Sequence, residues 1–272
     1  MKQFLSKLSF KNFLVLAAAL FLVACSDTTV GETGNGNSPE QSGLPTSPEK
    51  VKIQWNEDGG MLNRAEYILI STDSCFWDFQ RYGRNKQISF ELSDQEMDEL
   101  YAVFVENQFD KIECRKEDGV YDRGGVRIEL KADEKYIDVD NTGGSFVNDK
   151  WRKNWINVSD AITSLTQDKL KEQEFKATVR LDESIEVSDY DVKLSVEDPI
   201  IYDSEKDGEG KRKFDFEVLE GPTYMDLYLF VKDSLNQYGG KVTYLNEMFF
   251  FDFTPQRNEA TIYLEEGKLK VK

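Results

Sequence analysis

The stretch VRIELKADEKYIDVDN, residues 126–141, decides the fold class of the chain around it. Its first half alternates Val, Ile and Leu with Arg, Glu and Lys, and its second half alternates Ile137 and Val139 with aspartates. Because successive side chains of a strand point to opposite faces, this alternation predicts two strands with one buried and one solvated face. One-sided burial is typical of an antiparallel sheet.

Five segments that precede residue 126 in the sequence predict further strands. These segments lie around Trp55 and at Tyr67–Ser71, Phe76–Tyr82, Gln87–Leu92 and Lys111–Arg115. Phe76–Tyr82 and Gln87–Leu92 flank Gly83-Arg84-Asn85, which predicts a hairpin turn.

Two helices are expected to cover this sheet. Ser93 and Glu96 form a capping box ahead of an apolar stripe that runs from Met97 to Phe104. A longer helix is predicted from apolar residues that recur every three to five positions: Trp151, Trp155, Val158, Ile162, Leu165 and Leu170. Antiparallel strands with two helices on one face predict an α+β domain over residues 51–173.

Beyond the polar run Gln167–Gln173 the helical period disappears and short β-rich segments follow. They are Phe175–Leu181, Asp191–Val196, Phe214–Leu219, Met225–Lys232, Val242–Thr254, Ala260–Leu264 and Lys268–Val271. Strands at this spacing predict a β-sandwich domain of immunoglobulin or transthyretin-like type over residues 174–272.

The N-terminus has the layout of an export signal. Three lysines and no acid precede the apolar run Phe13–Val23, which is too short to span a bilayer core. The run ends in Leu22-Val23-Ala24-Cys25, which resembles the lipobox of bacterial lipoproteins. The resemblance implies a signal peptide over residues 1–24, a lipid (palmitate among its acyl chains) on Cys25 and, because Ser26 follows, the outer membrane. The alternative is an ordinary secretory signal followed by an unrelated cysteine.

Residues 25–50 are expected to form a disordered tether behind the lipidated cysteine. They are rich in Gly, Ser, Thr, Pro, Asn and Glu and contain almost no apolar residue that could offset the entropy cost of ordering. The folded part would then stand on the periplasmic side or on the cell surface.

The composition excludes several classes of function. The formal net charge is −17, so nucleic acid and anionic lipid head groups are poor partners for the folded part. The sequence has no histidine, which excludes His-containing triads and His-ligated zinc.

Cys75 and Cys114 remain once Cys25 is assigned to the lipid. In an oxidising compartment they are predicted to form a disulfide, the alternative being two separately buried thiols. A catalytic thiol is not expected, because no histidine is present to activate it.

Two segments partly match calcium loops. Asp203, Glu205 and Asp207 alternate ahead of a glycine, but Phe214 stands where an EF-hand requires a bidentate Glu, so a solvated hairpin loop is the favoured interpretation. Asp138 and Asp140 begin a second partial match, and there the solvated face of a strand is favoured.

Aromatic clusters allow two interpretations. Trp77, Trp151 and Trp155 could form a platform for sugar or peptide, but the helical spacing of two of them favours core packing. Met248–Phe251 is similarly interpreted as a central sandwich strand rather than an exposed recognition patch.

No set of residues commits the chain to one chemistry, and no catalytic residue is assigned. The first hypothesis is a non-catalytic lipoprotein with a binding or scaffolding role in the bacterial envelope, whose partner is an envelope protein or a polysaccharide. The rivals are a carboxylate-dependent envelope hydrolase and a calcium-stabilised binding module.

Overall fold

The structure, a computed structural model, describes residues 42–272 except residues 61–63, 121–122, 187, 198–199, 207–210 and 236–240. Residues 44–272 form one compact unit. The expected signal peptide and Cys25 lie outside the described residues. No helix in the described residues is long and apolar enough to span a bilayer.

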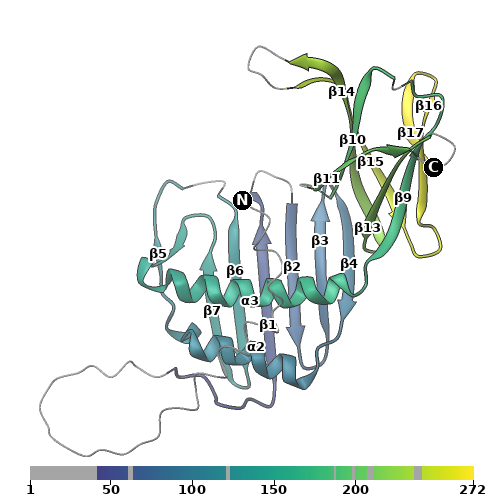
Figure 1. The fold of residues 1–272 in the computed structure, drawn as a ribbon. Coiled ribbons are helices and arrows are strands. Elements are labelled where there is room, and N and C mark those ends of the chain that lie inside the picture. Colours follow the sequence, from purple (N-terminus) through teal and green to yellow (C-terminus); the bar gives the residue numbers. More distant parts are fainter. Residues whose placement is uncertain are drawn as a thin grey trace, which may run out of the picture. The chain divides into compact units, whose positions relative to one another are not determined.

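The described chain is β-rich, with several antiparallel sheets and two α-helices, as predicted. The largest sheet has the strand order β4-β3-β2-β1-β6-β7 and is antiparallel throughout (Figure 1). Its strands are β1 (Val51–Asp58), β2 (Arg64–Ser71), β3 (Cys75–Arg81), β4 (Arg84–Phe90), β6 (Gly125–Ala132) and β7 (Lys135–Asn141).

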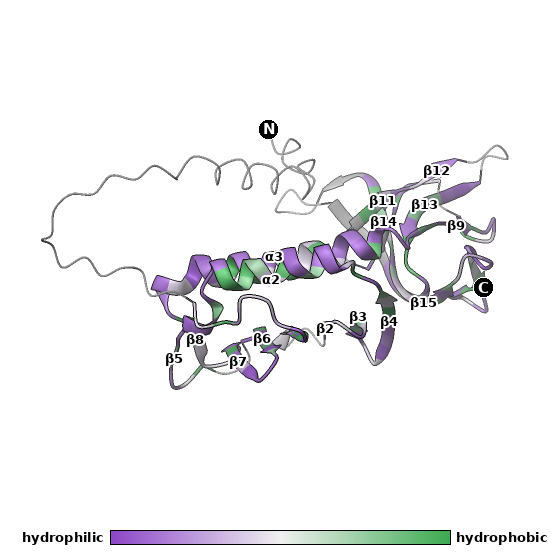
Figure 2. Ribbon diagram, turned by 90° about the horizontal axis from the view of Figure 1, so that it is seen from below, coloured by the Kyte–Doolittle hydropathy of each residue, from purple (hydrophilic) through white to green (hydrophobic). Residues whose placement is uncertain are grey.

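Two helices, α2 (Asp94–Glu106) and α3 (Arg152–Lys171), cover one face of this sheet (Figure 2). The predicted capping box is present, because Ser93 and Glu96 each bond the other's backbone N–H. Between helices and sheet lies a first core of buried side chains, with Ile53, Phe104 and Ile162 fully buried.

The hairpin turn lies one residue earlier than predicted. Tyr82 and Gly83 join β3 to β4, with φ of 48° and 73°. A two-residue loop with positive φ at both positions matches the right-handed twist of the strands, so the strands pair up to Arg81 and Arg84.

Smaller elements complete this region. The short strands β5 (Cys114–Lys116) and β8 (Ser145–Val147) pair with each other, and 3₁₀ turns η2 (Phe109–Lys111) and η3 (Asp149–Trp151) precede β5 and α3.

The remaining chain forms two sheets that share a second core, which includes Val179, Leu194 and Phe253. The four-stranded sheet contains β11 (Ile200–Asp203), β10 (Tyr190–Val196), β14 (Gly221–Leu235) and β15 (Lys241–Phe253), in that order. The five-stranded sheet contains β12 (Glu205–Lys206), β13 (Arg212–Val218), β9 (Phe175–Leu181), β16 (Glu259–Glu265) and β17 (Lys268–Val271), in that order. Only the β9–β16 pair among these is parallel.

The predicted disulfide between Cys75 and Cys114 is wrong. Both cysteines are free thiols. Cys75 begins β3, whereas Cys114 lies in β5 beside β7, four strand positions away in the sheet order. At about 4.8 Å per strand this is on the order of 19 Å, whereas a disulfide requires Cα atoms within about 7 Å.

The folded part begins before Val51. Leu44 is buried in the first core, and the hydroxyl of Tyr101 donates a hydrogen bond to the Pro45 carbonyl oxygen (2.8 Å). The polar run Gln167–Gln173, expected as a boundary, is helical as far as Lys171, because Leu170 belongs to the buried stripe of α3.

Candidate binding site on the open face of the six-stranded sheet

The six-stranded sheet has one face that the two helices do not cover, called the open face from here on (Figure 2). Its side chains alternate along each strand with those that enter the first core. The open face is formed by Lys52, Gln54, Asn56 and Asp58 of β1; Ala65, Tyr67, Leu69 and Ser71 of β2; Phe76, Asp78 and Gln80 of β3; Asn85, Gln87 and Ser89 of β4; Gly125, Arg127, Glu129 and Lys131 of β6; and Tyr136, Asp138 and Asp140 of β7.

Strand register arranges these side chains in rows across the sheet. The central row consists of Gln87, Asp78, Tyr67, Asn56, Arg127 and Asp140. Directly opposed side chains in neighbouring strands lie about 5 Å apart, so this row is a nearly continuous line of hydrogen-bonding groups. Amides, carboxylates, a phenol and a guanidinium therefore occupy one surface.

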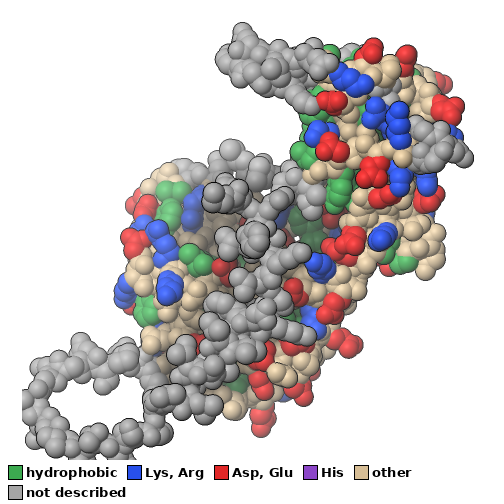
Figure 3. Space-filling view, viewed as in Figure 1, with side chains coloured by type: hydrophobic (Ala, Val, Ile, Leu, Met, Phe, Trp, Pro, Cys, Tyr) green, Lys and Arg blue, Asp and Glu red, His purple; other side chains and the backbone are tan. Residues whose placement is uncertain are grey.

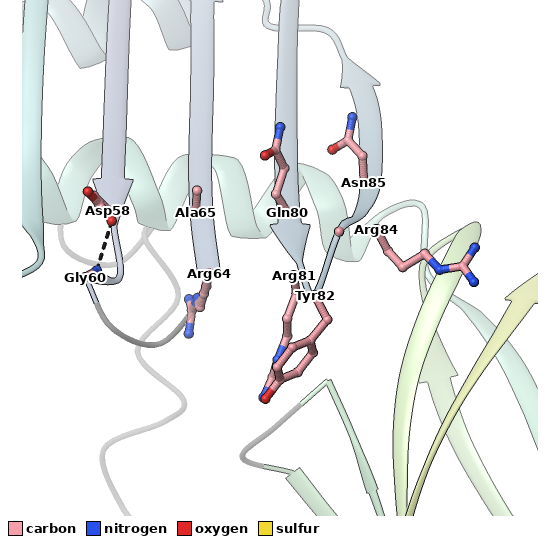
Figure 4. Close-up of a pocket in the computed structure, with 10 residues that line it drawn as sticks. Asp58, Gly60, Arg64, Ala65, Gln80, Arg81, Tyr82, Arg84 and Asn85 are labelled. Carbon is pink, nitrogen blue, oxygen red and sulfur yellow. Dashed lines mark hydrogen bonds between the residues drawn. The ribbon is translucent and has the colours of Figure 1, made fainter.

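Small residues leave hollows in this surface near one end of strands β3, β2, β1 and β6. The row next to the central one places Ala65 between Gln80 and Asp58, with Gly125 beyond Asp58. Two adjoining hollows, of about 680 Å³ and 480 Å³, share Asp58, Ala65 and Gln80. Figure 4 shows residues that line the second hollow, with Asp58, Ala65, Gln80 and Asn85 on neighbouring strands and a helix behind the strands.

Tyr67 is held in place at the centre of the open face. The amide nitrogen of Gln54 donates a hydrogen bond to its hydroxyl oxygen (2.9 Å), and its ring lies 5.6 Å from that of Phe76. Burial raises the pKa of Tyr67, with the hydrogen bond from Gln54 acting in the opposite direction. The hydroxyl therefore stays protonated at neutral pH and can still donate its own proton to a ligand.

Arg127 organises the adjacent charges. Its guanidinium donates two hydrogen bonds to Asp138 (2.8 and 2.7 Å) and lies 3.3 Å from Glu129, which also accepts from the Tyr136 hydroxyl (2.9 Å). The bond to Asp138 and the carboxylates nearby raise the pKa of Arg127. The charges of this part of the face are thus fixed in position by one another.

The weak calcium candidate is not assembled in the described residues. Asp203 pairs with Lys193 (2.9 Å), Glu205 lies in β12 opposite Lys213, and Asp207 lies outside the described residues. The described part of the chain has no group of three or more Cys, Asp or Glu side chains that could hold a metal ion.

The second calcium-like match is part of the open face. Asp138 is bound by Arg127, and Asp140 accepts hydrogen bonds from the backbone and hydroxyl of Thr142 (3.0 and 2.6 Å). The interpretation as the solvated face of a strand is confirmed for these two residues.

Core packing is confirmed for the tryptophans. Trp77 and Trp155 are buried in the first core, and Trp151 packs against it. Met248–Phe251 lies in β15, which is an edge strand of its sheet and not a central one as predicted. Phe249 and Phe251 nevertheless face the second core, while Met248 is exposed.

Reasoning from the sequence missed the open face as a site. Its polar residues occupy the outward positions of strands that were predicted, but each one looks like ordinary solvated surface until the register places them in rows. The only available indication was the abundance of Asn, Gln and Tyr at outward positions in β1–β4, where Lys and Glu would suffice for solubility.

Comparison with known proteins found no match: no protein family, no curated sequence and no solved structure is similar to this chain.

Proposed function

We propose that the protein is a lipid-anchored, extracytoplasmic binding protein that holds an uncharged polysaccharide of the bacterial envelope on its open face without cleaving it. The observation that supports this best is the hollowed row of fixed amide, carboxylate and phenol groups around Tyr67. Planar groups of this kind bind vicinal hydroxyls with paired hydrogen bonds, and an aromatic ring can pack on the apolar face of a sugar.

Charge favours a glycan over a protein as the ligand. Protein interfaces are depleted of charged residues, and Arg127, Glu129 and Asp138 form a charged group on β6 and β7, at one side of the open face. Acids dominate the larger hollow, where Glu57, Asp58, Glu66, Asp78 and Glu129 accompany a single arginine. A polyanion would be repelled there, and an uncharged, hydroxyl-rich polymer would not be.

The finer architecture is also part of the proposal. We infer an α+β domain over residues 51–173 and a β-sandwich over residues 174–272. Two separate clusters of buried residues support this division. Figure 3 shows acidic and basic side chains intermixed on the described part of one face of the protein.

The proposed anchor is a lipid on Cys25, with the chain that follows it as a tether. Metabolic labelling with a fatty acid should mark the natural chain and not the Cys25→Ser variant, because only the thiol accepts the diacylglycerol. Equal labelling of both chains would refute the lipid anchor while leaving the binding site untouched.

Binding is tested with uncharged glucose, galactose, mannose and N-acetylglucosamine oligosaccharides, titrated calorimetrically into the full chain in detergent. We expect saturable binding of at least one, weakened about tenfold by Tyr67→Ala, which removes the ring and its hydrogen bond. Tyr263→Ala, on β16, is the matched control and should bind normally.

Three results would contradict this proposal. The first is an absence of binding to every oligosaccharide of the panel. The second is an equal loss of oligosaccharide affinity in Tyr67→Ala and Tyr263→Ala. The third is shortening of the bound oligosaccharide during incubation, which would favour the carboxylate-dependent hydrolase.

A further inference from the structure

The two hollows of the open face form one groove that runs across the strands. The smaller hollow is lined by residues of β4, β3, β2 and β1, and the larger one by residues of β3, β2, β1 and β6. The two hollows share Asp58, Ala65 and Gln80. Five neighbouring strands therefore border the groove, which at about 4.8 Å per strand is on the order of 19 Å long.

Each of the five strands contributes a planar hydrogen-bonding side chain to this groove. In strand order these side chains are Asn85 of β4, Gln80 of β3, Tyr67 of β2, Asn56 of β1 and Arg127 of β6. Their order follows the sheet, so the groove presents one such group at each strand spacing.

Two of these groups are amides that the protein leaves for a ligand. Asn56 is half-buried, Gln80 is exposed where the two hollows meet, and neither side chain has a hydrogen-bond partner among the described residues. A side-chain amide both donates and accepts hydrogen bonds, as a sugar hydroxyl does.

The spacing of the strands suits an extended chain of six-membered sugar rings. In β-1,4-linked glucose, mannose or N-acetylglucosamine both bonds of each linkage are equatorial, so successive rings form a flat ribbon. The repeat of such a ribbon is close to the separation of neighbouring strands. Neighbouring strands turn by about 20°, which rotation at each linkage can follow. An α-1,4-linked chain bends at each axial bond and coils away from a sheet.

We propose that the glycan on the open face is an extended, equatorially linked chain that lies across the strands, with about one sugar over each strand from β4 to β6. Its hydroxyls exchange hydrogen bonds with the amides of Asn85, Gln80 and Asn56, and a central ring packs on Tyr67. The inference rests on the proposed function. It adds the linkage class of the glycan, its direction on the sheet and the length of the site.

The test titrates oligosaccharides calorimetrically into the full chain in detergent. The probes are β-1,4-linked oligomers of glucose, mannose and N-acetylglucosamine, from dimer to heptamer, and α-1,4-linked oligomers of glucose of the same lengths. We expect the affinity of at least one β-1,4 series to rise severalfold with each sugar up to the pentamer and then to level off, because five strands border the groove. The α-1,4 pentamer should bind at least about tenfold more weakly than the tightest β-1,4 pentamer.

Two variants distinguish a chain that lies across the strands from one that lies along β1 and β6. Asn85 lines the groove on β4, whereas Lys131 is an exposed residue of the open face on β6 that does not line either hollow. A chain across the strands reaches Asn85, and a chain along β1 and β6 would instead pass toward Lys131. Asn85→Ala should therefore weaken binding of the tightest pentamer severalfold, and Lys131→Ala should leave it unchanged.

A matched pair of glutamine variants assigns binding to the groove. Gln80→Ala removes the amide where the hollows meet, and Gln256→Ala removes an exposed amide between β15 and β16. Only Gln80→Ala should weaken the pentamer. Thermal unfolding of each variant verifies that it folds.

The possible failures of the inference differ from a failure of the proposed function. Affinity that already levels off at the trimer would overturn the inference, as would equal binding of α-1,4 and β-1,4 pentamers. A loss in Lys131→Ala without a loss in Asn85→Ala would also overturn it, and so would binding confined to oligosaccharides with other linkages. In each of these cases the glycan site would stand. Failure of every oligosaccharide to bind would instead refute the proposed function.

Discussion

Lys86 Nζ lies 2.5 Å from Oε1 of Glu197, and the lysine side chain is 2% exposed while the glutamate side chain is 27% exposed. The ammonium also donates hydrogen bonds to the Thr223 hydroxyl (3.3 Å) and the Leu219 carbonyl oxygen (3.5 Å). Lys86 of β4, in the six-stranded sheet, thus places its buried positive charge against Glu197, which directly follows β10. This charge must remain paired, because an isolated buried ammonium is strongly unfavourable.

Removing the carboxylate of Glu197 should therefore lower the free energy of unfolding more than removing the ammonium of Lys86. We expect Glu197→Gln to lower the free energy of unfolding by about 2 kcal/mol, since Lys86 stays buried with weaker partners. Lys86→Met keeps the apolar stem and removes the charge, so its cost should be about half as large. Urea unfolding monitored by fluorescence provides both values.

Asp149→Asn, which breaks the exposed pair with Arg152, is the control and should change stability much less than either substitution. A Lys86→Met variant that is clearly less stable than Glu197→Gln would contradict this account of the pair.

The capping box should make stability depend on pH through Glu96. Partial burial raises the pKa of this carboxyl, but hydrogen bonds from Lys169 and from the backbone and hydroxyl of Ser93 outweigh it, so the net pKa is lowered. A group with a lowered pKa in the folded state stabilises above its unfolded pKa and loses that contribution as the pH falls through the folded value.

Glu96→Gln should accordingly destabilise the protein at about pH 7, and the difference from the natural chain should shrink toward about pH 3. Thermal unfolding of both chains over this range measures the difference. A difference that stays constant with pH would mean that the carboxylate charge of Glu96 contributes nothing.

The cysteines should behave as two free thiols. Burial raises the pKa of both Cys75 and Cys114, so each should react slowly at neutral pH in the folded protein. Denatured Cys25→Ser protein that was never reduced should titrate two thiols, and a reductant should leave its melting temperature unchanged. Fewer than two thiols would mean that the strand order in this sheet is incorrect.

Local features of the fold were predictable from the sequence because they depend on neighbours in the chain. The alternation around Ile137 indicated strand β7, and Ser93 with Glu96 indicated the start of α2. The turn at Tyr82 was predicted one residue late because Gly83 alone does not reveal that Tyr82 also has a positive φ.

Features that depend on long-range pairing were not predictable. Cys75 and Cys114 both lie in strands of one region, and only the order of strands separates them. The rows of the open face likewise arise from register. Ala65 has no visible role in the sequence until Gln80 and Asp58 are placed on either side of it.

The central claim is that the hollow over Ala65 is a ligand site, and filling it tests the claim most directly. Ala65 is exposed and outside the core, so Ala65→Trp should fold normally and occupy the hollow. Ala102→Trp, on the exposed side of α2, adds the same ring elsewhere. We predict that calorimetric titration with the bound oligosaccharide shows at least a tenfold loss of affinity for Ala65→Trp and none for Ala102→Trp. Unchanged affinity in Ala65→Trp would contradict the account.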